Sequence, residues 1–214
     1  MSVLVKICGL STRASLAAAI EAGADMVGFV FFPKSPRHVT LEKASALAER
    51  ARGRAGIVAL TVDADDATLA DIVGVLGPDL LQLHGRETPR RVAHLRAKFG
   101  VPLMKAIGVV RREDLAAVEA YAGVDRLLLD AKPPIDAALP GGNGIPFDWR
   151  MLEGFEAGAP IMLSGGLDPA NVGEAIRTTR PAGVDVSSGV ESAPGLKDEA
   201  KITAFISAAR LAAG

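Results

Sequence analysis

The sequence predicts an α/β protein whose strands close into a (β/α)8 barrel, a TIM barrel. Short apolar runs alternate along the 214-residue chain with stretches of helical spacing, and eight such runs can be counted. The runs are nearly continuous in apolar character, which is typical of strands buried on both faces of a parallel sheet. Eight strand–helix units in about 250 residues or fewer are the signature of this barrel. We expect residues 1–214 to form a single domain.

The eight apolar runs are rich in Val, Ile and Leu. They are residues 3–7, 25–31, 56–62, 80–83, 102–107, 126–129, 160–163 and 183–186. Between them, residues 69–76 and 202–209 have apolar side chains at i, i+3, i+4 and i+7, the spacing of an amphipathic helix. Thr88-Pro89 and Asp168-Pro169 each place a capping residue before a proline, which predicts two helix starts.

The rival architecture is an open, doubly wound sheet. Against it, the first predicted strand is not followed by the G-x-G-x-x-G turn of a dinucleotide-binding fold. One long irregular stretch, residues 132–146, follows the sixth strand and contains Pro133-Pro134 and Pro140-Gly141-Gly142. A loop of this length in a compact domain is usually functional, and we expect it over the mouth of the barrel.

Composition excludes several classes of function. The chain has 24 basic and 25 acidic residues, interleaved without a basic block, so no nucleic-acid partner is expected. One cysteine excludes an internal disulfide framework, and the three histidines lack metal-ligand spacing, so no metal is expected. No signal peptide is evident, and the longest apolar run, residues 26–32, is far shorter than the about 20 residues of a membrane helix. We expect a cytoplasmic protein without membrane contact, a monomer rather than a homodimer.

Polar residues and glycines stand where most predicted strands end, and in a barrel these ends meet at one mouth. In chain order they are Cys8, Arg37, Asp63, His84, Asp130, Ser164-Gly165-Gly166, Asp185 and Ser187-Ser188-Gly189. A thiol and a carboxylate on different strands can face each other across such a mouth. Cys8 and Asp130 are therefore candidates for a base and an acid that act on one substrate.

Each candidate also has a plain structural interpretation. Cys8 shares a strand face with Lys6, whose charge would favour a thiolate, but single cysteines are often small buried hydrophobes. Arg37 could clamp a carboxylate or be a solvated loop charge. His84 either binds substrate or satisfies a loop carbonyl. Asp185 would point into the barrel, where it needs a partner, and Lys6 is the expected one.

The remaining polar candidates fit structural roles better. Asp63 is expected to cap a helix. His38, His94, Tyr121 and Trp149 are expected to be structural or exposed.

The last two strand ends indicate a phosphate site. Gly165-Gly166 and Ser188-Gly189 lie in neighbouring units, and glycines let backbone N–H groups approach an anion. Barrels commonly hold a phosphate between the loops after strands seven and eight. A single Gly-Gly is often just a turn, but two such loops side by side favour a phosphorylated ligand.

Motifs along nearly the whole chain resemble one enzyme family. They are Lys6-Ile7-Cys8-Gly9-Leu10, Gly28-Phe29-Val30-Phe31, Ser35-Pro36-Arg37, Gln82-Leu83-His84-Gly85, Leu129-Asp130, Gly141-Gly142-Asn143-Gly144, Phe147-Asp148-Trp149, Leu163-Ser164-Gly165-Gly166-Leu167, Asn171-Val172 and residues 183–191. Together they resemble the phosphoribosylanthranilate isomerases of tryptophan synthesis. One departure is Asn143, where a small hydroxyl residue is expected, and residues 135–139 lengthen the same loop.

The resemblance implies a cofactor-free Amadori rearrangement of N-(5-phosphoribosyl)anthranilate into an aminoketose. Cys8 would be the general base and Asp130 the general acid, while Arg37 would hold the anthranilate carboxylate. His84 and Asp185 would support the rest of the substrate. Backbone groups around Gly165, Gly166, Ser188 and Gly189 would hold the phosphate.

Two alternatives remain open. One is another phosphosugar barrel enzyme, such as indole-glycerol-phosphate synthase or a histidine-pathway isomerase; the latter relies on two aspartates, so the pair of Cys8 and Asp130 speaks against it. The other is a non-catalytic barrel that binds a phosphorylated metabolite.

Overall fold

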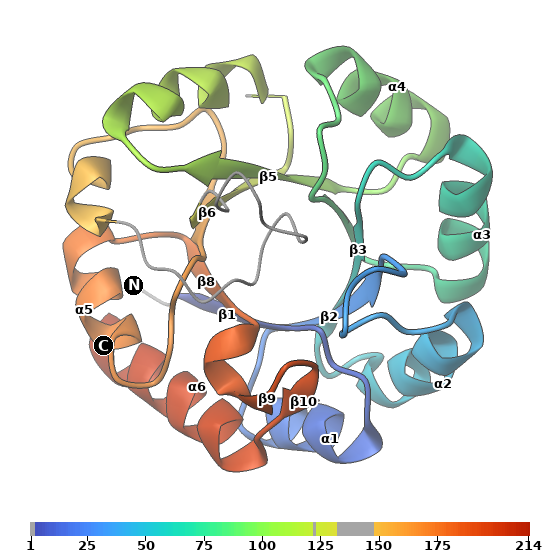
Figure 1. The fold of residues 1–214 in the computed structure, drawn as a ribbon, viewed down its shortest axis with the longest axis horizontal. Coiled ribbons are helices and arrows are strands. Elements are labelled where there is room, and N and C mark those ends of the chain that lie inside the picture. The colour runs from blue at the N-terminus through green and yellow to red at the C-terminus, as the bar shows by residue number, and fades with distance from the viewer. Residues whose placement is uncertain (1–2, 122, 132–147) are drawn as a thin grey trace.

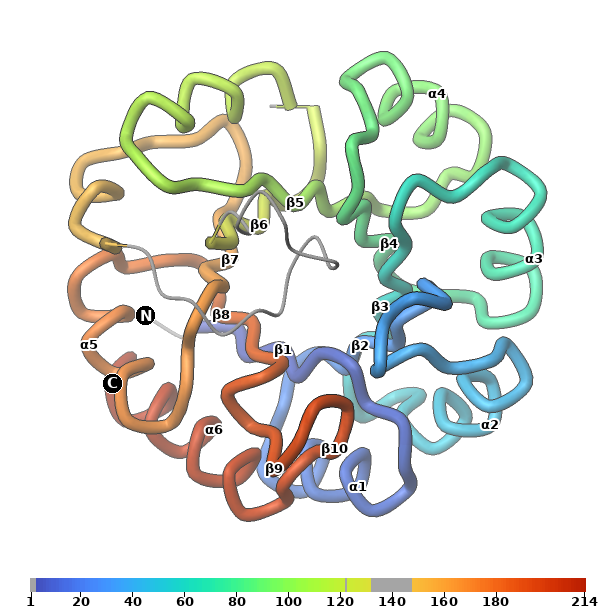
Figure 2. The backbone as a smooth tube through the Cα atoms, viewed as in Figure 1, coloured from blue at the N-terminus to red at the C-terminus, as the bar shows by residue number. Residues whose placement is uncertain are grey.

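Eight parallel strands form a closed barrel in the computed structural model, which describes residues 3–121, 123–131 and 148–214. Figures 1 and 2 show the strands as an inner ring with the helices around it. The strands are β1 (Leu4–Cys8), β2 (Met26–Phe31), β3 (Gly56–Thr61), β4 (Leu80–Leu83), β5 (Leu103–Val109), β6 (Arg126–Ala131), β7 (Ile161–Leu163) and β8 (Gly183–Val186). The predicted barrel is thus confirmed, and every predicted run overlaps a strand, although β1, β5 and β6 extend past the predicted ends.

The outer ring consists of α-helices and 3-10 helices that follow the strands. They are α1 (Arg13–Glu21), α2 (Leu41–Ala51), α3 (Asp66–Leu76), α4 (Pro89–Phe99), η1 (Arg112–Tyr121), η2 (Trp149–Leu152), α5 (Val172–Thr179), η3 (Ser188–Val190) and α6 (Glu199–Ala213). A small antiparallel hairpin of β9 (Glu191–Ala193) and β10 (Leu196–Lys197) interrupts the last unit. Figure 1 places this hairpin between α1 and α6.

The barrel closes because β1 pairs with both β2 and β8. In these ladders Lys6 lies opposite Met26 on one side and opposite Asp185 on the other. Alternate residues of each strand point to opposite faces. Lys6 and Cys8 therefore share the interior face with Asp185, as predicted from strand alternation.

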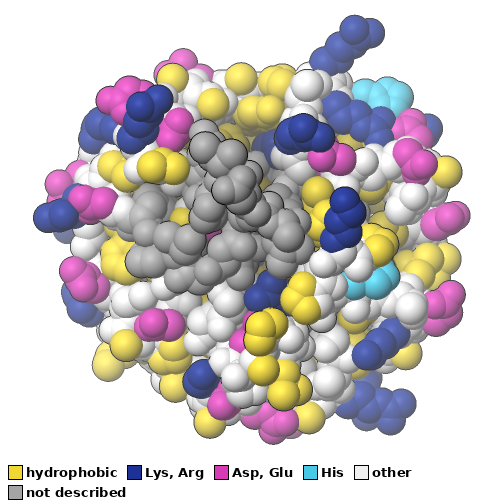
Figure 3. All heavy atoms as spheres, in the orientation of Figure 1, with side chains coloured by type: hydrophobic (Ala, Val, Ile, Leu, Met, Phe, Trp, Pro, Cys, Tyr) yellow, Lys and Arg dark blue, Asp and Glu magenta, His cyan; other side chains and the backbone are white. Residues whose placement is uncertain are grey.

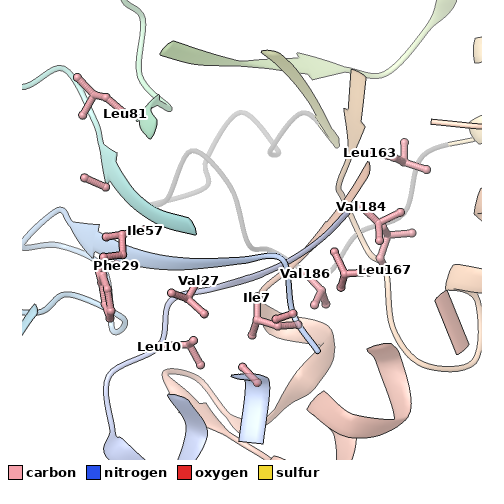
Figure 4. Packing of buried hydrophobic residues seen from close by; sticks show 14 of the residues in the cluster. Ile7, Leu10, Val27, Phe29, Ile57, Leu81, Leu163, Leu167, Val184 and Val186 are labelled. Carbon is pink, nitrogen blue, oxygen red and sulfur yellow. The ribbon is translucent and has the colours of Figure 1, made fainter. Parts of the chain in front are cut away.

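The two faces of the barrel wall bury different clusters. Ile7, Val27 and Val186 belong to the large cluster between the strands and the helices, and Figure 4 shows them on the helix side of the wall. The interior is filled by a second, smaller cluster of apolar side chains. Its buried members are Val58, Leu80, Met104, Ala106, Leu128 and Met162. Because these apolar side chains fill the barrel interior, the polar groups of the site lie at the strand ends.

Local sequence signals set most helix boundaries. Thr88 caps α4 by accepting the Arg91 N–H at 3.2 Å, with Pro89 as the first helical residue. Gly77 and Gly100 end α3 and α4 in the left-handed region, at φ of 54° and 64°.

The predicted helix start at Asp168-Pro169 is wrong. The Asp168 carboxylate accepts the N–H groups of Ala170 and Asn171, at 2.7 and 3.0 Å. These bonds close a turn, and α5 begins only at Val172, with Asn171 at its cap. The capping acid therefore stabilises a turn that precedes the helix.

The predicted long loop, residues 132–146, lies outside the described residues, and so does Asn143. Within the described part of the chain, no helix is long and apolar enough to cross a membrane. No cluster of three or more potential metal ligands occurs there either. On the face shown in Figure 3, acidic and basic side chains are mixed around the rim.

Candidate active site

Cys8 and Lys6 form the floor of the site together with Asp185. The Lys6 ammonium donates a hydrogen bond to Asp185 Oδ1 at 2.7 Å, and both side chains are buried. The predicted pairing of these two residues is thus present. A Cβ on Gly28 would lie 3.2 Å from both Cys8 Sγ and Lys6 Nζ. The thiol and the ammonium therefore lie side by side over this glycine, which has no side chain to separate them.

Burial and charge act in opposite directions on these groups. Burial raises the pKa of the Cys8 thiol, and the Lys6 ammonium beside it counteracts part of that rise. Burial would lower the pKa of Lys6, but the Asp185 carboxylate and the thiol outweigh it, so the pKa of Lys6 is raised. Lys6 thus stays charged beneath the thiol and can stabilise a thiolate.

Asp130 and His84 meet on the opposite side of the mouth. Asp130 lies near the end of β6, and its Oδ2 is 3.4 Å from His84 Nε2. Gln82 Nε2 lies 3.0 Å from His84 Nδ1. With the amide nitrogen assigned as donor, Nδ1 accepts and the histidine proton is on Nε2, directed toward Asp130. Asp130, which was predicted as an acid, and His84, which was predicted to bind substrate, therefore lie side by side.

The glycine loops after β7 and β8 lie against each other, and the loop after β7 also contacts Asp130. Gly165 has φ of 84°, and a Cβ on it would lie 2.5 Å from the Ala131 nitrogen and 3.1 Å from Asp130 Oδ1. A Cβ on Gly189 would lie 1.9 Å from the Leu167 carbonyl oxygen. Both glycines are therefore required by close backbone approach. The two loops predicted to hold phosphate lie against each other, with Ser188 at the start of η3.

Arg37 lies in the loop between β2 and α2 and is buried by an ion pair. Its Nε and Nη2 donate to the two oxygens of Glu191, at 2.7 and 2.8 Å. This is the bidentate geometry in which a guanidinium is best fixed. A Cβ on Gly9 would lie 2.8 Å from Arg37 Cδ. The side chain thus runs directly beside the residue that follows Cys8.

Sequence reasoning missed Glu191 and Lys197 as parts of the site. The Lys197 ammonium donates to Glu191 Oε1, to Ser187 O and to Ser187 Oγ, at 2.8, 2.8 and 3.1 Å. Ser187 Oγ in turn donates to Cys8 O at 3.2 Å. Glu191 ended a recognised motif, which was a usable signal. Lys197 had none, because only the hairpin brings it back to the mouth.

The charges of this cluster support one another. Burial acts to raise the pKa of the Glu191 carboxyl, but Arg37 and Lys197 outweigh it, so the pKa lies below its ordinary value. Burial lowers the pKa of Lys197, and Glu191 counteracts that effect in part. Glu191 is therefore held as a carboxylate between two cations.

Asp63 was predicted to cap a helix, and this is wrong. Asp65 caps α3, while Asp63 Oδ1 accepts the Arg86 N–H at 2.6 Å and steadies the loop after β4. That loop is also held by Lys105, whose ammonium donates to Gly85 O and to Glu87 Oε2 at 2.8 and 3.0 Å.

Four residues that were expected to be structural or exposed have such positions. His38 and His94 are exposed, Trp149 begins η2, and the Tyr121 hydroxyl donates to Glu87 O at 3.0 Å.

Comparison with known proteins points to one family. The family model described as N-(5'-phosphoribosyl)anthranilate (PRA) isomerase matches residues 5–208. The isomerase of that name from Nitrobacter hamburgensis is 62% identical over 213 residues, which cover 99% of this chain and 95% of the relative. The one from Rhodopseudomonas palustris strain HaA2 is 60% identical over 98% of this chain and 97% of the relative.

Solved structures agree with these matches. The phosphoribosyl anthranilate isomerase of Thermotoga maritima superimposes with a TM-score of 0.88 at 34% identity, covering 97% of this chain and 98% of that one. A second isomerase structure, with a TM-score of 0.83 at 33% identity and the same coverage, holds reduced 1-(o-carboxyphenylamino)-1-deoxyribulose 5-phosphate. The chain matches both along nearly its whole length.

Proposed function

The chain belongs to the N-(5'-phosphoribosyl)anthranilate isomerase family of tryptophan biosynthesis, and on that premise we propose that Cys8 and Asp130 catalyse an Amadori rearrangement. The substrate would be N-(5'-phosphoribosyl)anthranilate and the product 1-(2-carboxyphenylamino)-1-deoxyribulose 5-phosphate. The observation that supports the proposal is the arrangement of the mouth. A thiol beside an ammonium lies at the end of β1, while a carboxyl near the end of β6 lies beside a histidine and the glycine loop after β7.

The first proposed step is general acid catalysis by Asp130. The protonated carboxyl donates its proton to the ribose ring oxygen, and the C1–O bond breaks. The nitrogen lone pair forms a C1–N double bond, so the product of this step is an iminium ion. His84 touches the same carboxyl at 3.4 Å and would hold it toward the ring. A positioned proton transfer of this kind contributes about 10²–10⁴ in rate.

The second proposed step is proton abstraction by Cys8. The iminium makes the C2 proton acidic, and the Cys8 thiolate removes it to give an enol-amine. The enol then loses its hydroxyl proton and gains a proton at C1, which gives the ketone. Asp130 has given one proton and Cys8 has taken one, so substrate and product have the same composition, and proton exchange with solvent restores both side chains. Lys6 would stabilise the thiolate, and because burial raises the pKa of the thiol, that thiolate would be a strong base once formed. These steps use proton transfers alone and need no cofactor.

Binding at two ends would orient the substrate for both steps. Arg37 would hold the anthranilate carboxylate, and the backbone around Gly165, Gly166, Ser188 and Gly189 would hold the phosphate. We assign His84 and Asp185 to the middle of the substrate. Asp185 would act there chiefly through its ion pair with Lys6. Holding both ends converts remote binding energy into orientation.

A fluorescence assay tests this function. Anthranilate fluorescence should fall when freshly generated phosphoribosylanthranilate meets the protein, well above the spontaneous rate, and NMR of the product should identify the aminoketose. Tight binding without acceleration would contradict the proposal and favour a phosphometabolite-binding barrel. The single domain over residues 1–214, the cytoplasmic location and the monomeric state stay predictions.

A further inference from the structure

We propose that Glu191 and Lys197 are positioning residues that make the site specific for a carboxylate on the aromatic end of the ligand. They would do so by fixing the Arg37 guanidinium against the end of β1. The inference rests on the proposed role of Arg37 and adds what determines its placement.

The first support is the number of bonds that Glu191 concentrates in one buried place. Its carboxylate accepts from Arg37 Nε and Nη2, from Lys197 Nζ and from the Gly195 N–H, the last at 3.2 Å. An arginine side chain has many rotamers, and ordering it on binding costs free energy. Because Glu191 already orders the guanidinium, a ligand carboxylate would meet a preorganised cation.

The second support is the charge of the cluster. Arg37, Glu191 and Lys197 are all buried, and the two cations and one carboxylate sum to one net positive charge. The Glu191 carboxylate holds both cations in place, but it neutralises only one of their two positive charges. An anionic group is therefore attracted to this part of the mouth, whereas Glu191 with Arg37 alone would be neutral.

The third support is the connection of the cluster to the base. Lys197 donates to Ser187 O and Oγ, and Ser187 Oγ donates to Cys8 O. On the other side, the Arg37 side chain packs against Gly9, since a Cβ on Gly9 would lie 2.8 Å from Arg37 Cδ. The guanidinium is thus placed relative to Cys8 from two directions. A misplacement of about 1 Å can cost on the order of 10²-fold in rate, so this spacing matters for the reacting atoms.

The hairpin of β9 and β10 lies against the loop that carries Arg37. A Cβ on Gly195 at its tip would lie 2.5 Å from the Pro36 carbonyl oxygen, so the tip packs against the residue before Arg37. Gly195 has φ of 81°, which favours glycine at this contact. Figures 1 and 2 show the hairpin as an addition to the barrel beside α1. It supplies both Glu191 and Lys197.

Two ligands that differ only in the carboxylate test the inference. One is reduced 1-(o-carboxyphenylamino)-1-deoxyribulose 5-phosphate, and the other is the same compound without its carboxyl group. The dissociation constants of both are measured by calorimetry for the wild type, Glu191→Gln and Lys197→Met. The wild type should prefer the carboxylated ligand by about 10- to 100-fold, the range of charge-assisted hydrogen bonds. Each variant should lose most of that preference and bind the other ligand within about twofold of the wild type.

Matched variants separate the possible failures. Lys201→Met changes a nearby lysine that donates only to the Glu191 main-chain oxygen in this cluster, and it should keep the preference. Lys197→Arg keeps a positive charge at this position and should retain the preference for the carboxylated ligand. Arg37→Ala should abolish it; if Arg37→Ala keeps the preference, the proposed role of Arg37 is wrong. If Arg37→Ala loses it while Glu191→Gln and Lys197→Met keep it, the positioning inference alone is wrong.

If Glu191 and Lys197 had a merely structural role, their replacement would weaken the binding of both ligands equally. That outcome overturns the inference. If Glu191→Gln does not fold, Glu191→Asp is measured in its place. The shorter acid keeps the charge but withdraws it from the guanidinium. Loss of preference in this variant supports the inference, and an unchanged preference overturns it.

Discussion

Replacing Lys6 with methionine should destabilise the fold strongly, because it leaves the Asp185 carboxylate buried without its closest partner. The Lys6 and Asp185 side chains are 0% and 6% exposed, and they are joined at 2.7 Å. Removing one partner of such a pair costs about 3–5 kcal/mol. Against a total unfolding free energy of about 5–15 kcal/mol, this is a large fraction. Guanidinium-induced unfolding measures it directly.

A double-mutant cycle identifies the cause of that loss. Lys6→Met/Asp185→Asn removes both charges and keeps the shape of the acid, so it should be more stable than the sum of the single variants predicts. We expect a coupling free energy of about 2–3 kcal/mol, the upper range for groups in contact. The exposed pair of Glu49 and Arg52 is the control, with side chains 67% and 41% exposed. Its coupling should stay below about 1 kcal/mol.

The pH dependence of the coupling gives a second check. The pKa of Lys6 is raised above its ordinary value of 10.5. The stabilisation is therefore fully present below that ordinary value and is lost only as the pH rises through the higher, folded-state value. The coupling should be equal at about pH 7 and about pH 9. A coupling below about 0.5 kcal/mol, or one already lost by about pH 9, would refute the assignment of a buried ion pair.

Three further predictions concern other parts of the mouth. Because burial raises the pKa of Cys8, the only cysteine, its alkylation by iodoacetamide should accelerate with pH through a midpoint above 9.0, and a midpoint below it would contradict this environment. Lys105→Met should cost about 3–5 kcal/mol in urea unfolding, since it leaves Glu87 buried without its cation; a loss under about 1 kcal/mol would show the pair to be unimportant. Gly189→Ala should weaken inorganic phosphate binding measured by calorimetry, because its Cβ would collide with Leu167 O, and unchanged binding would separate this contact from the phosphate loops.

Much of the fold could be predicted because its determinants are local. Continuous apolar runs mark strands buried on both faces, and the Thr88-Pro89 pair marks the start of α4. The pairing of Lys6 with Asp185 also followed from alternation, since both point into the same interior. The start of α5 was mispredicted because Asp168 can satisfy a turn as well as a helix, and sequence alone does not decide between them.

The site was predictable only in part. Strand ends predicted Cys8 and Asp130 as candidates, since topology brings such ends together. The contacts of His84 with Asp130 and of Arg37 with Glu191 depend on side-chain directions in three dimensions. Lys197 returns to the mouth through a hairpin whose pairing has a register shift, and no periodicity in the sequence marks it.

Turnover of two variants tests whether Cys8 and Asp130 carry out the proposed proton transfers. Cys8→Ser removes the proposed base and Asp130→Asn the proposed acid, each with little change in shape. We predict that each lowers kcat by about 10²-fold or more, while the dissociation constant for reduced 1-(o-carboxyphenylamino)-1-deoxyribulose 5-phosphate stays within about threefold of the wild type. Near-normal kcat in either variant would contradict the assignment of that residue to proton transfer.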